Sequence, residues 1–204
     1  MRRRKPSGTR FRATSYPWWG ESVCWVETRP PRPGREAAIY NGEVKFRLRD
    51  FRRADFDALW KLDQECFPRG IAYTRLELAA YMKRSGAFTV VADRETGRDI
   101  LGFIVAEANR RRVGHIITID VLPAARRFGI ASELLTSAED RLRAARCRMV
   151  QLETAVDNAG ALAFYKRHLY DVIRTQPHYY PNGLDAFVLQ KDLLSPPLEV
   201  KLLR

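Results

Sequence analysis

The segment "VLPAARRFGIASELL", Val121 to Leu135, constrains the fold more than any other part of the chain. The residues before it, "HIITID", include the β-branched types that favour a strand. After it, apolar residues recur at helical spacing: Ile130, Leu134, Leu135, Ala138 and Leu142. A strand, a glycine-bearing turn and a helix N-terminus form an anion site, because the free amides of the first helical turn point into the turn. Arg126 and Arg127 add positive charge, so the segment predicts a ligand that carries phosphate.

The composition predicts a single globular domain with an extension. The chain has 204 residues, of which 46% are hydrophobic, and no apolar run approaches the roughly 18 residues that span a membrane. The basic start "MRRRK" is not followed by an apolar segment, so we predict no signal peptide and a cytoplasmic protein, monomeric or weakly dimeric. Cys24, Cys66 and Cys147 are odd in number and lack metal-ligand spacing, which predicts reduced thiols and no metal site.

The charge of the chain is strongly basic. Lys and Arg number 36 against 24 Asp and Glu, a net charge of +12, and residues 1–43 hold nine basic and four acidic residues, or +5. This balance suits nucleic acid, ribosomes, acidic peptides or a polyanionic cofactor, and does not choose among them. Residues 1–43 also hold five of the 11 prolines and three of the four tryptophans, without periodicity, so we predict a poorly ordered arm there.

Hydrophobic patterning from Val44 onward predicts the order β-α-α-β-β-β-α-β-α-β-β. Thr74 and Glu77 form a capping-box pattern that opens the second helix. The expected elements are a strand from residue 44, helices over about 54–66 and 75–84, three strands within 87–122 with turns near 94–99 and 109–113, the helix after the turn, a strand at 148–154, a helix at 159–168, and strands near 171–175 and 186–192. The domain therefore covers residues 44–193, and 194–204 form a tail.

A family resemblance follows from three motifs. P-x-x-R-R-x-G-x-A after the fourth strand, "LETAVDNAGALAFYKRHLY" and "HYYPNGLDAFVLQKDL" resemble the GNAT superfamily of acetyl-CoA-dependent N-acetyltransferases. Within it the chain is most similar to the protein N-terminal acetyltransferases of the RimI type, which acetylate ribosomal protein. The resemblance covers residues 44–193 and implies an α/β (α+β) fold, with a mixed, mostly antiparallel sheet that splays between its fourth and fifth strands and is flanked by helices.

The resemblance implies a cofactor site for acetyl-CoA. Its pyrophosphate would lie on the main-chain amides of the turn, and its pantetheine would pair like an added strand with the end of the fourth strand. Gly129 would allow the close approach of the backbone to phosphate, and Asn158 is a helix N-cap that would also reach the coenzyme. The residues implied are Ile119, Asp120, Val121, Arg126, Arg127, Phe128, Gly129, Ile130, Ala131, Ser132 and Asn158.

The resemblance also implies catalytic and acceptor-binding residues. Glu153 would be the general base, through a water, and Tyr165 the general acid toward the coenzyme A thiolate; His115 is a rival base. Phe67, Pro68 and Tyr73 would belong to one peptide-binding loop, and Tyr179 and Tyr180 to another. Leu169 replaces the glycine that usually closes the helix after the tyrosine, so either that helix ends differently or Leu169 is strained.

Several alternatives stay open at this point. The expected acceptor is a protein or peptide N-terminus, a ribosomal protein among the candidates, and a lysine side chain, a polyamine or an antibiotic-like amine is the alternative. From another class, an inactive acyltransferase fold would bind RNA or the ribosome through the basic arm, whose arginines and tryptophans suit single-stranded RNA. The presence of both Glu153 and Tyr165 argues against that reading.

Overall fold

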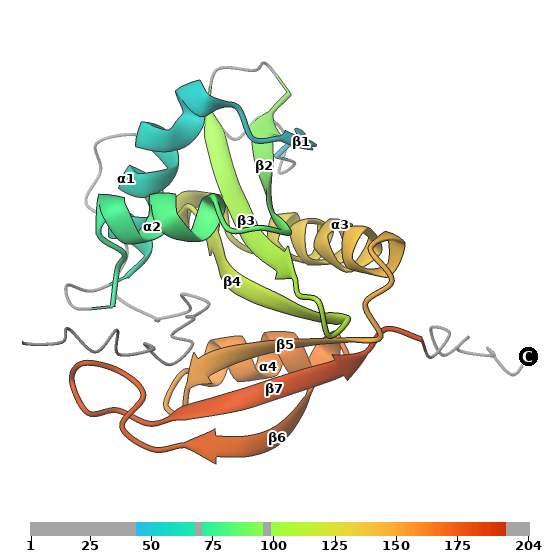
Figure 1. The fold of residues 1–204 in the computed structure, drawn as a ribbon. Coiled ribbons are helices and arrows are strands. Elements are labelled where there is room, and N and C mark those ends of the chain that lie inside the picture. The colour runs from blue at the N-terminus through green and yellow to red at the C-terminus, as the bar shows by residue number, and fades with distance from the viewer. Residues whose placement is uncertain (1–43, 68–70, 96–98, 195–204) are drawn as a thin grey trace, which may run out of the picture.

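The computed structural model describes residues 44–67, 71–95 and 99–194, which form a seven-stranded sheet flanked by helices (Figure 1). The order of strands in the sheet is β1-β2-β3-β4-β5-β7-β6, so the last strand of the chain lies between β5 and β6. The strands are β1 Phe46–Asp50, β2 Ala87–Arg94, β3 Ile100–Ala108, β4 Val113–Val121, β5 Met149–Ala155, β6 Asp171–Gln176 and β7 Ala186–Asp192. The arm at 1–43 and most of the tail at 194–204 lie outside the described residues.

The sheet has one parallel contact, between β4 and β5, and it is short. Val113, Gly114 and His115 of β4 face Met149, Val150 and Gln151 of β5, and no later pair of these strands is in register. By contrast, β5 pairs with β7 along its whole length, and β3 with β4 nearly so. The sheet therefore splays between its fourth and fifth strands, which confirms the predicted mixed, mostly antiparallel α/β fold.

The helices divide between the two faces of the sheet (Figure 1). They are α1 Phe56–Cys66, α2 Arg75–Met82, α3 Ile130–Ala144 and α4 Ala159–Arg167, and short 3-10 turns precede α1 at Arg53–Asp55 and follow β4 at Pro123–Ala125. One buried cluster joins α1 and α2 to the sheet, centred on Leu59, Leu78 and Phe103. A larger one joins α3 and α4 to the other face, with Leu134 and Leu135 completely buried.

Local sequence signals explain several element ends. The predicted capping box is confirmed, since the Thr74 N–H donates to the Glu77 carboxylate at 2.9 Å and the Glu77 N–H donates to Thr74 Oγ1 at 3.3 Å. Leu169 has φ of +65° and is 54% exposed, so of the two outcomes predicted for it the strained conformation is the one found. The first strand begins at Phe46 rather than Val44, and the second helix ends at Met82 rather than near Arg84.

Candidate active site

The two candidate bases meet where β4 and β5 part. His115 belongs to the last paired position of β4, and Glu153 lies two residues beyond its β5 partner, Gln151. Because residues two apart lie on one face of a strand, Glu153 stays on the same side as Gln151. His115 Nε2 lies 2.7 Å from Glu153 Oε2, and the side chains are 14% and 10% exposed. From the sequence, Glu153 and His115 are alternative candidates for the general base. In the structure the two side chains form a hydrogen bond with each other.

His115 has one nitrogen to spare. Its Nδ1 is buried and has no hydrogen-bond partner among the described residues. Since Nε2 binds the carboxylate, a neutral imidazole that donates through Nε2 leaves the Nδ1 lone pair available. This nitrogen is therefore open to a further hydrogen bond.

Tyr165 lies on α4 and is almost completely buried, with 1% of its surface exposed. Its ring contacts those of Phe164 and Tyr170, at centroid distances of 5.2 Å in each case. Burial raises the pKa of the phenol well above its ordinary value of 10, and the charges of Asp120 and Tyr180 raise it further. The phenol is therefore protonated at neutral pH and can act only as a proton donor.

The turn between β4 and α3 has the features of an open anion site. Gly129 is the N-cap of α3 with φ of +83°, and no side chain caps the helix. A Cβ built on Gly129 would meet no atom within 4 Å, so the space beside this backbone is open. Arg127 also has positive φ, at +71°, and its side chain is exposed. Uncapped amides, an open approach and an exposed guanidinium fit the pyrophosphate of a coenzyme A.

The other turn residues hold this site in place. Arg126 Nε donates to the main-chain carbonyl of Val121 at 3.2 Å, which ties the turn back to the strand end. Ile130 and Ala131 are buried against the core, and Phe128 packs partly against it. The arrangement fixes the backbone of the first turn of α3 while leaving its amides accessible.

The end of β4 offers an unpaired strand edge. Beyond His115, this strand has no partner in β5, so Ile119, Asp120 and Val121 line the open side of the splay. Asp120 is completely buried, and its Oδ1 accepts a hydrogen bond from the Thr118 hydroxyl at 3.0 Å. A flexible chain with amide groups, such as pantetheine, can satisfy an exposed strand edge of this kind.

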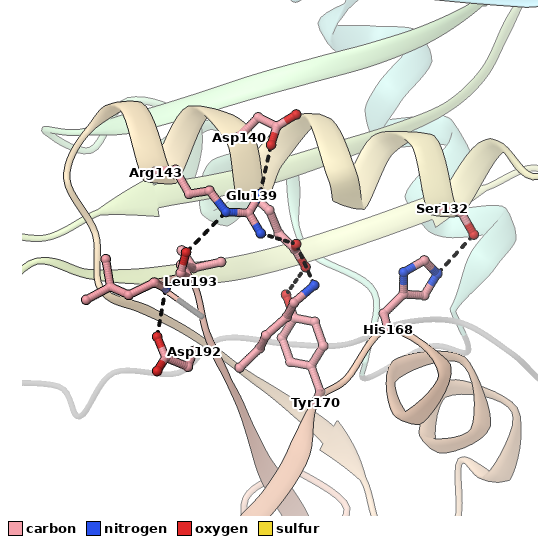
Figure 2. A network of polar contacts seen from close by, with 10 residues as sticks. Ser132, Glu139, Asp140, Arg143, His168, Tyr170, Asp192 and Leu193 are labelled. Carbon is pink, nitrogen blue, oxygen red and sulfur yellow. Dashed lines mark hydrogen bonds and ion pairs between the residues drawn. The ribbon is translucent and has the colours of Figure 1, made fainter. Parts of the chain in front are cut away.

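Two further cofactor candidates have local partners. The Asn158 side chain accepts from the Ala161 N–H at 3.0 Å, which confirms it as the N-cap of α4. Ser132 Oγ lies 3.0 Å from His168 Nε2, so the first turn of α3 is joined to the end of α4 (Figure 2). Burial lowers the pKa of His168 from its ordinary 6.5, opposed by the charge of Glu139, so the imidazole is neutral at pH 7.

The candidate acceptor-binding residues are mostly buried. Tyr73 is 5% exposed, and its hydroxyl lies 3.4 Å from the Ile117 carbonyl inside the α1–α2 core. Tyr179 and Tyr180 are 1% and 2% exposed and stack edge to face. Phe67 ends α1 and packs partly against the same core as Tyr73, and Pro68 lies outside the described residues. Their role toward an acceptor stays a prediction.

Sequence reasoning named Asp120 as a cofactor residue but missed its buried polar partner in β4, Thr118. Thr118 and Asp120 are buried polar residues in a strand whose neighbours are apolar, and they lie on one side of the strand at i and i+2. Their alternation within "HIITIDVL" was the available signal. Within the described ranges, no group of three or more His, Cys, Asp or Glu residues gathers as metal ligands would, and no helix is long and apolar enough to cross a membrane.

Comparison with known proteins agrees with the fold. Residues 56–169 match the family model described as acetyltransferase (GNAT) family. An N-alpha-acetyltransferase of Sulfurisphaera tokodaii is 26% identical over 161 residues, which cover 73% of this chain and 94% of that protein. Ard1 of Thermoplasma volcanium superposes with a TM-score of 0.67 at 23% identity, over 74% of this chain and 100% of that one. The ribosomal-protein-S18-alanine N-acetyltransferase of Escherichia coli gives 0.65 at 17% identity, over 76% and 98%. The chain thus belongs to the GNAT family and is an acetyl-CoA-dependent N-acetyltransferase.

Proposed function

We propose that this enzyme acetylates the α-amine of protein N-termini in the cytoplasm, with a ribosomal protein as a natural acceptor. The observation that carries the proposal is the His115–Glu153 hydrogen bond at the point where β4 and β5 part. The similarity to the N-alpha-acetyltransferase of Sulfurisphaera tokodaii supports the same acceptor.

The strength of the base favours an α-amine over a lysine. An α-amine with a pKa of about 7.7–8.0 costs about 1 to 1.4 kcal/mol to deprotonate at pH 7. A lysine side chain with a pKa near 10.4 costs about 4.6 kcal/mol by the same conversion. One carboxylate with an imidazole partner suits the smaller cost, because no second charged base accompanies Glu153 among the hydrogen bonds of the described residues.

Glu153 and His115 act together in this proposal. Glu153 accepts the proton of the incoming ammonium through a water, and the neutral amine then attacks the thioester carbonyl. His115 holds the carboxylate in place by donating through Nε2. Glu153 returns the first proton to solvent through the water and then accepts the second, which the nitrogen loses as the amide forms. In this proposal Glu153 is the base and His115 orients it.

Tyr165 supplies the proton at the other end of the reaction. When the carbon–sulfur bond breaks, the departing thiolate takes a proton from the phenol, which burial keeps protonated. The resulting phenolate is disfavoured in its buried site, and it regains a proton from solvent as product leaves.

The first turn of α3 and the end of β4 bind acetyl-CoA. Arg127, the amides from Phe128 to Ser132 and the open space at Gly129 hold the pyrophosphate. The unpaired edge from Ile119 to Val121 receives pantetheine, which places the acyl group in the splay between the strands. Tyr73, Tyr179 and Tyr180 shape the wall along which the acceptor peptide enters.

A peptide array tests the acceptor directly. Peptides with free N-termini, each with and without an internal lysine, are incubated with labelled acetyl-CoA beside copies whose N-termini are already acetylated. We expect label on every class with a free α-amine and none on blocked peptides that retain lysine. Equal labelling of blocked lysine peptides would assign the enzyme to side-chain amines instead. Spermidine is assayed beside the peptides, and labelling of spermidine alone would assign the enzyme to polyamines.

A further inference from the structure

Two loops at one end of the sheet bring five arginines together. The β3–β4 turn carries Arg110, Arg111 and Arg112, and the loop between α3 and β5 carries Arg146 and Arg148. Figure 1 shows the two loops on the same side of the molecule. All five side chains are exposed, and we call them the arginine surface. Neither loop contains an acidic residue.

Hydrogen bonds hold the two loops in a fixed relation. The Arg148 N–H donates to the Arg112 carbonyl at 2.8 Å, which joins the loops directly. Within the β3–β4 turn, Asn109 Oδ1 accepts from the N–H groups of Arg111 at 2.9 Å and Val113 at 3.1 Å. The arginines are therefore displayed from a backbone that is ordered before any ligand arrives, which lowers the entropy cost of binding.

Two of these arginines occupy strained backbone positions. Arg112 and Arg146 both have φ of +61°, the left-handed region that glycine and asparagine favour. An arginine has no short polar group with which to relieve the strain locally, unlike Asn or Asp. A charged side chain at both positions is therefore kept at a cost to folding, which points to a use outside the folded domain.

The charge of the arginine surface is not balanced within the domain. None of its five side chains makes an ion pair or hydrogen bond with another residue that the structure describes. Neighbouring Arg143, on the last turn of α3, shows the contrast, because it pairs with Glu139 and Asp140. Five unpaired guanidinium groups repel one another, and an external polyanion removes that repulsion.

We propose that the arginine surface binds the phosphodiester backbone of a nucleic acid without reading its sequence. Guanidinium groups present a planar fork that matches phosphate oxygens, and arginine rather than lysine occupies all five positions. Closely spaced phosphates supply the repeated negative charge that five neighbouring arginines require.

The cofactor turn stays open while this surface is occupied. The arginine surface lies at the start of β4, and the cofactor turn follows the end of that strand, eight residues after Val113. At about 3.3 Å per residue the two are separated by roughly 26 Å. Binding therefore tethers the enzyme and leaves the cofactor turn accessible, whichever amine is the acceptor.

The first experiment measures binding of the full chain to a fluorescein-labelled oligouridine of about 20 nucleotides, by anisotropy, between about 50 and 200 mM salt. A variant with Arg110→Gln, Arg111→Gln and Arg148→Gln is compared with a control of equal charge, Lys45→Gln, Arg53→Gln and Arg174→Gln, whose residues are also exposed. The basic residues of 1–43 are present in both. We expect the slope of log Kd against log salt to fall by about 2 in the first variant only, since three phosphate contacts are lost.

Equal losses in the two variants would overturn the proposal, because net charge alone would then explain binding. Polyglutamate that competes as well as RNA at equal charge would also overturn it, and would assign the surface to an acidic protein. DNA of the same length and sequence type should bind as RNA does, and a tenfold preference for either would contradict readout of the backbone alone.

A second variant separates binding from folding. Arg112→Gly with Arg146→Gly removes two charges and suits both positive φ values, so the unfolding midpoint should stay the same or rise while RNA binding weakens. Leu169→Gly is the matched control, because Leu169 has φ of +65° and no charge. Its RNA affinity should equal that of the unaltered protein. If Leu169→Gly weakens binding as much as the arginine variant does, or the arginine variant binds normally, the proposal is wrong.

Discussion

Glu139 and Glu153 are both buried carboxylates, at 4% and 9% exposure, yet their surroundings differ. Glu139, on α3, receives three donors: Lys191 Nζ at 2.6 Å, the Tyr170 hydroxyl at 3.0 Å and Arg143 Nη2 at 3.2 Å (Figure 2). Glu153 has His115 alone at 2.7 Å among the described residues. Two cations contact Glu139, whereas Glu153 contacts a single imidazole.

The same contrast applies to two buried tyrosines. Burial raises the pKa of both Tyr165 and Tyr170, and the charge of Glu139 raises that of Tyr170 further. The Tyr170 hydroxyl donates a hydrogen bond to Glu139, which joins the start of β6 to α3. A shifted pKa therefore does not identify a catalytic group, and the partners of the group separate a structural cluster from a reactive one.

The largest expected effect is on turnover in Tyr165→Phe, which should lower kcat by about 10²- to 10⁴-fold while acetyl-CoA binding changes little. The matched variant, Tyr170→Phe, loses the 3.0 Å hydrogen bond to Glu139 and should keep its kcat while unfolding more easily. The kcat of each variant is measured from the rate at which coenzyme A is released, with a reagent that detects its thiol. Since the pKa of Tyr165 lies well above 10, its deprotonation should cause no loss of activity below about pH 10.

Next in size is Glu153→Gln, which should lower kcat by about 10²-fold at pH 6 to 7. The loss should shrink toward pH 9, because the α-amine is then neutral without help from a base. A pH profile of kcat on a free-N-terminal peptide decides the point. A deficit of the same size at every pH up to about 9 would show that Glu153 has a structural role, like Glu139.

Glu139→Gln should act on stability instead of turnover. Lys191 and Arg143 would lose their charged partner, at a cost of about 2 kcal/mol, reduced because the Arg143 side chain is 37% exposed to solvent. Denaturant unfolding measures the change, and kcat for the folded fraction should stay normal. A drop in kcat with unchanged stability would erase the distinction between the two carboxylates.

A smaller effect is expected in the cofactor turn. Gly129→Ala places a Cβ in open space, so the cost is backbone strain at φ of +83°, of about 1 to 2 kcal/mol. The strained turn of the variant relaxes to another conformation when no acetyl-CoA is bound, and binding must restore the original one. KM for acetyl-CoA should therefore rise about tenfold, while kcat changes little. The exposed Gly183, with φ of +81° and similarly open space, is the control, and Gly183→Ala should leave KM unchanged.

The smallest effect concerns pH and stability. Burial lowers the pKa of His168 in the folded state, so the folded protein disfavours protonation of this imidazole. The unfolded chain takes up the proton more readily below about pH 6.5. The free energy of unfolding therefore decreases as pH falls through this range. His168→Gln should therefore reduce the fall in unfolding midpoint between about pH 7 and 5. Its amide can keep the contact with Ser132. An unchanged fall would mean that other groups control acid unfolding.

Short sequence patterns predicted the structural features that depend only on residues close together in the chain. The capping box of α2, the apolar face of α3 and the strain at Leu169 each follow from residues within a few positions. The His115–Glu153 contact could not be foreseen, because it depends on the register of a parallel pair 38 residues apart. The Glu139 cluster likewise joins α3, the start of β6 and β7, and no spacing in the sequence indicates that these segments meet.

The position of β7 between β5 and β6 has a consequence for synthesis. In the sheet, Glu153 faces Val188, and β6 has no neighbour except β7. A ribosome delivers the residues of β1 to β4 first, and their antiparallel pairs can form from what has already emerged. The other part of the sheet must wait for Ala186–Asp192. A nascent copy therefore acquires the strand that pairs with the Glu153 strand only after these residues have emerged from the ribosome.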